Sequence, residues 1–512
     1  MNYLVAPEFL VISTGILGML NLITPFISKE DSNLRSFFLL SVSIMFLGDV
    51  LLLDYLFLNG IEAYFVLFDF GKYSIAIELE ALGMIFLTLL AILWFIALLY
   101  TIKFLEINNM KNSNRFIFFM NCCILVASII ALSANLLTMF VGYEILTLCT
   151  IPLISHQGGE KMAEGLFKYL KILMLTSLIL FLPALIIIYS KIGHGHFTYN
   201  GFIDGHFSKT DSILLLLMFI FGIAKAAIYP FHAWLPAAMV ASYPVSALLH
   251  AAIVVKTGLF CIYKILLYVF GLEYLQTLFP SYNWLVLLPI ITILYSSVQS
   301  IRYTQIKMIL AYSTINQLSI ALMSAFMLTH KAMVAAVMHM ISHSFTKICL
   351  FYTAGNIYSV KNSYEISDLV GIRSTMPKTS FIMLISGLSL MGIPPFAGFI
   401  SKLYIMLAAA EQENILVMIT LVISTLFSAL YVIKILIFVY RPTSDNFILY
   451  LKLKPYFDEN AKGKSAKGII NAKFKAEERL PNFMIFSVFL CAGGVVAFFL
   501  IKQAITQFLL FI

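Results

Sequence analysis

The sequence predicts an all-α polytopic membrane protein with about fourteen transmembrane helices. Of its 512 residues, 61% are hydrophobic and only 11% are charged, and the mean hydropathy is +0.96. Apolar runs of roughly 20 residues, the length that crosses a bilayer as a helix, recur along the whole chain. A single soluble core does not need so much apolar surface, so the composition excludes an ordinary soluble protein.

The expected spans follow one another with short connections. In chain order they lie near 5–27, 36–58, 80–103, 116–134, 135–155, 167–190, 211–229, 245–269, 283–300, 306–328, 332–358, 379–408, 415–440 and 483–509. The first run has neither a basic start nor a clear small-residue cleavage site. We therefore expect it to be a retained helix rather than a signal peptide.

The connections alternate between basic and poorly basic. The odd-numbered connections carry Lys29 and Arg35, then Lys103, Lys111 and Arg115, then Lys161 and Lys168, then Arg302, then Lys361, Arg373 and Lys378, and a long basic loop near 441–480. Even-numbered ones, such as 59–79, are short or acidic. Basic connections face the cytoplasm, so both termini are expected outside, in the inner membrane of a prokaryotic cell.

The basic balance and the cysteines have plain explanations. The net charge of +8 comes from loops on one membrane face, so no nucleic-acid partner is expected. The six cysteines lie within apolar runs, without the spacing of a disulfide framework or a zinc site. The loop at 441–480 suits a solvated connection, an anionic membrane surface or a partner protein, and the sequence leaves these open.

Two spans are interrupted by proline. The seventh contains Pro230 and Pro236, and the twelfth contains Pro394 and Pro395. The breaks are five spans apart, and five is odd, so two five-helix units of opposite orientation would each have a broken fourth helix. The alternative is that the prolines only kink two separate helices.

This spacing predicts four parts of the chain, two of them inverted repeats. They are three N-terminal helices at 1–115, a first five-helix repeat at 116–270, a second at 281–440, and the basic loop with the last helix at 441–512.

Few charged residues fall inside the predicted spans, and these are the candidate site. A lysine in the apolar interior costs on the order of 3 kcal/mol on insertion scales, so it is rarely present without a partner or a water path. Glu144 on the fifth span and Lys225 on the seventh are natural partners. They could form a fixed salt bridge, or a switch in which Lys225 keeps its proton only while Glu144 is close.

Further lysines extend the possible route. Lys256 lies on the eighth span and Lys402 follows the break of the twelfth. A snorkelling role is the alternative for Lys256, but it lies about a dozen residues from either end of its span, which is far for its side chain to reach the interface.

Histidines accompany these lysines. His339, His343 and Lys347 follow at i, i+4 and i+8 and so share one helical face, as the groups of a proton wire would. Two histidines at this spacing can also bind zinc, yet no third ligand is evident, so no metal is expected. His250 either relays protons or hydrogen-bonds between helices.

Polar residues of the tenth span leave a similar choice. They either hold water or join helices, and they are Ser313, Thr314, Asn316 and Gln317.

No motif for a cofactor is present in the sequence. It has no glycine-rich phosphate loop after a strand, no cysteine set for an iron–sulfur cluster and no nucleophile elbow. We therefore expect no cofactor and no catalytic residue, and leave open whether the chain is part of an enzyme.

The motifs taken in order resemble one family over nearly the whole chain. They are YEIL, KAAIYPFHAWLPAAMVASYPVSALLHAAIVVKTGLF, MHMISHSFTK and GIPPFAGFISKLYIM. The sequence is similar to the antiporter-like membrane subunits of respiratory complex I, Mrp cation/proton antiporters and membrane-bound hydrogenases. The resemblance implies a fourteen-helix proton-translocating subunit with two inverted five-helix repeats.

The resemblance also implies roles for individual residues. Glu144 and Lys225 match the family's paired glutamate and lysine, Lys256 matches its eighth-helix lysine, and Lys402 its twelfth-helix charged residue. With both Lys256 and Lys402 present, the chain looks most similar to the D-type Mrp subunit. Glu80 stands where relatives often carry aspartate.

Three functional hypotheses result. The first is a proton-translocating subunit of an Mrp-type sodium/proton antiporter, with other membrane subunits, protons, the lipid bilayer and a candidate role for sodium. The second is a proton-pumping membrane subunit of an NADH:quinone oxidoreductase or hydrogenase, which would count as a translocase although it holds no redox centre. The third, a stand-alone symporter, would need a roomier substrate site.

Overall fold

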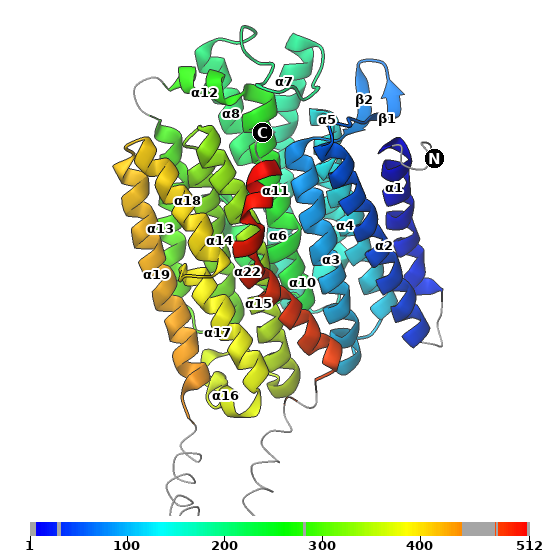
Figure 1. Ribbon diagram of the computed structural model, residues 1–512, viewed down its shortest axis with the longest axis vertical. Coiled ribbons are helices and arrows are strands. Elements are labelled where there is room, and N and C mark those ends of the chain that lie inside the picture. Colours follow the sequence, from blue (N-terminus) through cyan, green and yellow to red (C-terminus); the bar gives the residue numbers. More distant parts are fainter. Residues whose placement is uncertain (1–6, 28–31, 280–282, 443–476, 478–479, 509–512) are drawn as a thin grey trace, which may run out of the picture.

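The computed structural model describes residues 7–27, 32–279, 283–442, 477 and 480–508, and these form a bundle of long, roughly parallel helices (Figure 1). Ten of the helices are long and apolar enough, by length and composition, to cross a membrane. Each expected span coincides with helical backbone, although the number that cross stays a prediction. The basic loop predicted at 441–480 lies almost wholly outside the described residues.

The first half of the chain forms the helices on one side of the bundle. They are α1 (Pro7–Ile23), α2 (Ser32–Leu58), α3 (Ala81–Ile107), α4 (Ser113–Ala131), α5 (Leu136–Ile154), α6 (Glu160–Thr176), α7 (Leu182–Ile192), α8 (Lys209–Gly222), α9 (Trp234–Ala237), α10 (Tyr243–Ala247) and α11 (Val254–Lys264). A π-helical segment joins α6 to α7 at Ser177–Phe181, and two others flank α11 at Leu248–Ala252 and Ile265–Phe270.

The second half completes the bundle. Its helices are α12 (Leu272–Leu278), α13 (Leu287–Arg302), α14 (Ile306–Ala325), α15 (His330–Lys361), α16 (Ile372–Thr375), α17 (Pro377–Met391), α18 (Ala397–Glu411), α19 (Ile415–Tyr440) and α22 (Asn482–Phe508). The last helix, α22, crosses the bundle obliquely and packs on α3 and α15 (Figure 1).

A β-hairpin stands where only a connection was expected. Strands β1 (Tyr64–Phe70) and β2 (Tyr73–Glu78) pair antiparallel, with an irregularity between Val66 and Phe68. The hairpin is held to the α4–α5 connection by backbone hydrogen bonds from Ala134 N to Ala76 O at 3.0 Å and from Glu78 N to Leu132 O at 2.7 Å. It lies at the end of the bundle opposite α16 (Figure 1).

The seventh span is broken, as expected, but the break begins before its prolines. Helix α8 ends at Gly222, and Lys225 lies in a 3-10 turn at Ala224–Ala226. The indole of Trp234 donates a hydrogen bond to the carbonyl of Ala224 at 2.8 Å, which satisfies a backbone group that the helix no longer pairs.

The twelfth span is broken at the predicted prolines. Helix α17 ends at Met391 and α18 begins at Ala397, with Gly392 at φ +86° between them. A Cβ on Gly398 would lie 1.8 Å from the carbonyl oxygen of Ser389. Glycine therefore allows the two half-helices to approach closely.

The outer surface of the bundle is apolar. Large hydrophobic side chains of α19, such as Leu426 and Ile437, are 61% and 59% exposed. In contrast, lysines and histidines are buried inside. This inside-out distribution fits a protein whose solvent is the hydrocarbon core of a bilayer.

The alternating charge of the connections predicts the side of each loop. A cysteine at Lys111 should react with a membrane-impermeant thiol reagent from the cytoplasmic side only, because its connection is basic. A cysteine at Asp204, on the opposite face, should react from outside only. Both positions are exposed. Labelling of the two positions from the same side would contradict this orientation.

The break at Lys225 depends on a glycine of α11. A Cβ on Gly258 would lie 2.4 Å from both Ala226 N and Lys225 C, which are backbone atoms. Gly258→Ala is therefore expected to destabilise the purified protein by about 1–3 kcal/mol, the usual cost of overpacking, measured as a lower midpoint of thermal unfolding. Gly48→Ala is the matched control, since nothing lies within 4 Å of its added Cβ. Equal midpoints for the two variants would contradict the prediction.

Candidate functional site

Lys225 is fully buried at the break of the seventh span. Its Nζ donates hydrogen bonds to the carbonyl of Tyr143 at 2.6 Å and to Thr147 Oγ1 at 2.7 Å, and lies 3.1 Å from the centroid of the Tyr143 ring. The backbone N–H of Lys225 in turn donates to the hydroxyl of Tyr143 at 3.2 Å. Three oxygens of α5 thus hold the break and its lysine, and two of them belong to a residue next to Glu144.

Glu144 lies beside this cluster without touching the lysine. In the described part of the chain its two carboxylate oxygens have no hydrogen-bond partner and no ion-pair contact with Lys225 within 4.0 Å. The neighbouring side chains on α5, Ile145 and Leu148, are 42% and 51% exposed. The structure therefore brings Glu144 and Lys225 onto adjacent elements but shows them apart, with Glu144 near the lipid-facing side of α5.

Lys256 and His343 are in direct contact. Both are buried, and Lys256 Nζ lies 2.7 Å from His343 Nδ1. This contact joins α11 of the first half of the chain to α15 of the second. Two titratable nitrogens at hydrogen-bond distance can exchange a proton directly.

The other two predicted histidines extend this contact in different ways. The rings of His339 and His343 are nearly parallel, with centroids 6.3 Å apart, and His339 Nδ1 lies 2.9 Å from Ser401 Oγ on α18. His250 lies in the π-helical segment before α11 and packs on the ring of Phe351. Its two ring nitrogens have no hydrogen-bond partner among the described residues.

Lys347 connects α15 to the tenth predicted span, α14. Its Nζ donates to the carbonyl of Leu310 at 3.0 Å and to the hydroxyl of Ser313. Two further polar residues of α14 join helices: Asn316 donates to Ser297 Oγ at 2.6 Å, and Gln317 donates to Ser428 Oγ at 3.2 Å. These contacts favour the helix-joining interpretation for Asn316 and Gln317 and place Ser313 in the lysine cluster.

Lys402 reaches back to the break of its own span. Its Nζ donates to the carbonyls of Leu390 and Met391 at 3.1 and 3.2 Å, at the C-terminal end of α17. The negative end of a helix dipole favours a cation there. Lys225 and Lys402 thus share a device, a buried lysine held by main-chain oxygen at a helix break.

Lys307 is a buried lysine that the sequence did not suggest. By position it is a residue at the edge of its span, yet its Nζ contacts the carbonyls of Met239 and Ala241 and lies 4.4 Å from the ring centroid of Tyr243. These partners come from a distant segment of the chain, so they surround the lysine only in three dimensions.

A cavity of about 530 Å³ leads to Lys307 from the basic face. Its lining includes Asn108, Lys161 and Asn362, which lie in or next to basic connections. The cavity therefore gives the lysine cluster a polar opening on one side of the membrane.

A second unforeseen feature is an ion pair at the opposite face. Lys264 at the end of α11 lies 2.8 Å from Glu80, the residue before α3, and is fully buried. In the sequence Glu80 stands out for its residue type alone, because its partner lies far away along the chain.

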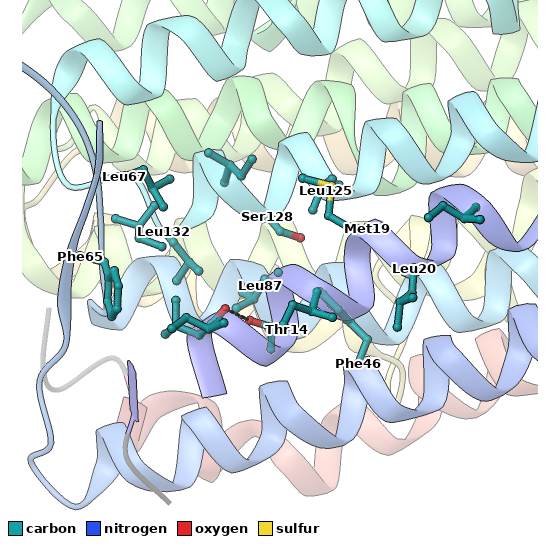
Figure 2. A pocket seen from close by; sticks show the side chains of 17 residues that line it. Thr14, Met19, Leu20, Phe46, Phe65, Leu67, Leu87, Leu125, Ser128 and Leu132 are labelled. Atoms are coloured by element: carbon teal, nitrogen blue, oxygen red, sulfur yellow. Dashed lines mark hydrogen bonds between the residues drawn. The ribbon is translucent and has the colours of Figure 1, made fainter. Parts of the chain in front are cut away.

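The apolar pocket in Figure 2 has a different chemistry. It measures about 430 Å³ and lies between α1, α4 and the hairpin. Apolar side chains such as Met19, Leu125 and Phe65 make up most of its wall, and the hydroxyl of Thr14 donates to its own helix. It therefore offers no charged group to a proton or a cation.

Within the described residues, no group of three or more His, Cys, Asp or Glu side chains could hold a metal ion. The chemistry that the buried residues can carry out is proton exchange between amines, imidazoles, hydroxyls and carboxylates.

A family model described as NADH:quinone oxidoreductase/Mrp antiporter, TM, matches residues 133–428, which is more than half of the chain. The chain belongs to this family. The match covers α5 to most of α19, and so includes every predicted site residue. The resemblance inferred from the motifs is confirmed, and the chain is an integral membrane protein.

Relatives come from both branches of the family. NADH-quinone oxidoreductase subunit L of Buchnera aphidicola subsp. Schizaphis graminum is 28% identical over 461 residues, covering 86% of this chain and 72% of its own length. One of the Na(+)/H(+) antiporter subunits of Alkalihalophilus pseudofirmus is 30% identical over 351 residues, covering 64% of this chain and 42% of its own length. The D-type assignment stays a prediction.

Two solved structures have the same fold. A chain in the structure of the Mrp complex from Dietzia sp. DQ12-45-1b aligns with a TM-score of 0.81 at 20% identity, over 99% of this chain and 96% of that one. A chain of the membrane-bound sulfane sulfur reductase, an archaeal respiratory membrane complex, aligns with a TM-score of 0.74 at 21% identity, over 96% and 100%. Both neighbours are subunits of larger membrane complexes.

Proposed function

We propose that this chain is the proton-translocating membrane subunit of an Mrp-type sodium/proton antiporter. The observation that carries the proposal is the contact of Lys256 Nζ with His343 Nδ1 at 2.7 Å in the buried centre of the bundle. Buried ionisable groups are costly in a membrane and mark ion or proton paths by default. Direct contact between two of them is more than a snorkelling lysine would produce.

The proposed route enters from the basic face. Protons reach Lys307 through the 530 Å³ cavity, pass to Lys347, whose partner Ser313 lies on the same helix as Lys307, and then to the Lys256–His343 pair. His250 lies between these groups and has unpaired ring nitrogens in the described chain, so it could accept a proton from either side. The exchange of sodium belongs to the complex as a whole in this proposal.

Lys225 and Glu144 act as the switch in this proposal. The structure corresponds to its open state, in which the lysine is held by Tyr143 and Thr147 and the carboxylate is free of it. A neighbouring protein packed on the exposed side of α5 could move Glu144 toward the lysine. Closing the pair would favour the protonated lysine, and opening it would release the proton onward.

The two inverted five-helix repeats are part of the proposal. The breaks at Lys225 and Lys402 fall in the fourth predicted helix of each unit, and both lysines bind backbone carbonyls. Repeats of opposite orientation would let one half open to the cytoplasm and the other to the outside.

A proton-pumping subunit of a respiratory complex is the second candidate. It is favoured by the match to NADH-quinone oxidoreductase subunit L, which extends over 72% of that protein. Both candidates use the same buried residues. Purification of the native complex separates them, because flavin and iron–sulfur subunits indicate the redox complex and small membrane subunits the antiporter.

Loss of either member of the switch should stop proton-coupled transport. Lys225→Ala and Glu144→Ala are expected to lower sodium-dependent proton movement in membrane vesicles by about 100-fold, the lower range for loss of a proton-transferring group. Lys331→Ala is the matched control, because Lys331 forms an exposed ion pair with Glu411 away from the route. Membrane content of each variant is measured by immunoblot. Normal transport by both variants would refute the switch.

A further inference from the structure

The structure contains a second polar cluster that the proposed route does not use, at the face opposite the basic connections. Here the hairpin, the start of α3, the α4–α5 connection and the end of α11 meet. We propose that Lys264 and Glu80 form the terminus of the proton route on this face. The inference rests on the proposed function and extends it from the centre of the bundle to the outer surface.

The geometry of the pair is asymmetric. Lys264 Nζ lies 2.8 Å from Glu80 Oε1, and it also donates to the carbonyl of Ser133 and to Ser133 Oγ at 3.2 Å. The lysine side chain is 0% exposed, whereas the glutamate side chain is 13% exposed. A proton on Lys264 therefore has one carboxylate beside it, and that carboxylate reaches toward the surface.

Lys264 is also placed on the same helical face as Lys256. The two residues are eight positions apart, which is two turns or about 12 Å along the axis. Phe260 lies between them on this face, stacked on Phe86 of α3 with ring centroids 4.7 Å apart. Lys264 Nζ lies 5.5 Å from the Phe260 ring. The aromatic pair thus separates the central lysine from the outer one, as an apolar constriction separates two wet compartments.

Acidic groups continue from Glu80 to the water. Glu78, the last residue of β2, is half-buried next to it. Burial raises the pKa of Glu78 above its ordinary value, Lys264 opposes this rise, and Glu62 adds to it. Tyr268 is the other titratable group that faces Glu80, from the segment after α11. The surroundings of the pair are therefore acidic on the solvent side and cationic on the membrane side.

The proposed step conserves protons. A proton released from Lys256 crosses the constriction through water and binds the uncharged amine of Lys264. An N–H bond of Lys264 then breaks as an O–H bond forms on the carboxylate of Glu80. The carboxylic acid releases the proton to water at the hairpin, and both residues return to their starting forms.

A purely structural role is the competing explanation, because Lys264 also holds the α4–α5 connection, on which the hairpin docks, through Ser133. The two roles differ in what they require of residue 264. A structural pair needs a cation, which arginine supplies, whereas a terminus needs a group that gives up its proton, which arginine does not do. Glutamine at 80 keeps a hydrogen bond to the lysine but accepts no proton.

The test uses the assembled complex in membrane vesicles. Glu80→Gln, Lys264→Met and Lys264→Arg are expected to lower proton transport by about 100-fold, and Glu80→Asp to retain it. The matched control is Lys331→Met with Glu411→Gln, an exposed ion pair with a 2.7 Å contact elsewhere in the chain. A cysteine at Ala76, which is fully buried on β2, reports loss of hairpin docking through its reactivity with a thiol reagent.

Each outcome decides between the explanations. Loss of transport in Glu80→Gln and Lys264→Arg with an unreactive cysteine supports the terminus. Normal transport in Glu80→Gln, or loss of transport only where the cysteine becomes reactive, overturns it. If Lys225→Ala is inactive while Glu80→Gln is active, the proposed function stands and this inference fails. If Lys225→Ala is active, the proposed function itself fails.

Discussion

The structure depends on how it holds uncompensated lysines inside a membrane. An isolated ammonium group in an apolar medium is strongly unfavourable, and the chain contains only one buried carboxylate contact, Lys264 with Glu80, among its described lysines of the interior. The others are held by main-chain carbonyls, hydroxyls or an imidazole. These neutral partners stabilise a proton weakly enough for it to leave, which a buried salt bridge at every lysine would not allow.

The helix breaks supply those neutral partners. A regular helix uses all its internal carbonyls, so a lysine in its middle finds no acceptor there. Interrupting the helix at Lys225 and ending another at Met391 frees oxygen atoms and brings side chains of neighbouring helices close. The glycines at 258 and 398 permit this approach, because a Cβ at either would meet backbone atoms. Packing, breaks and proton chemistry are therefore one arrangement rather than three.

Much of this arrangement could be read from residue types. The apolar runs marked the helices, and charges inside them marked Lys225, Lys256, Lys347 and Lys402 as unusual. The hairpin was missed because its strands are short, rich in aromatic residues and irregular in register, so their pattern does not differ from that of a connection. Lys307 was missed because a lysine near a span boundary ordinarily reaches water, and only the fold of segments 236–243 and 358–364 over it shows that it does not.

The sequence by itself determined the membrane class, the order of the spans, the family and the residue types available for proton exchange, because hydropathy and charge act along the chain. The tertiary structure alone decided which of those residues meet. Lys256 and His343 are 87 positions apart, and Lys264 contacts Ser133 across 131 positions. It also showed Glu144 apart from Lys225. A hydrogen bond depends on distances of a few tenths of an ångström, and only the packing of helices against one another sets these.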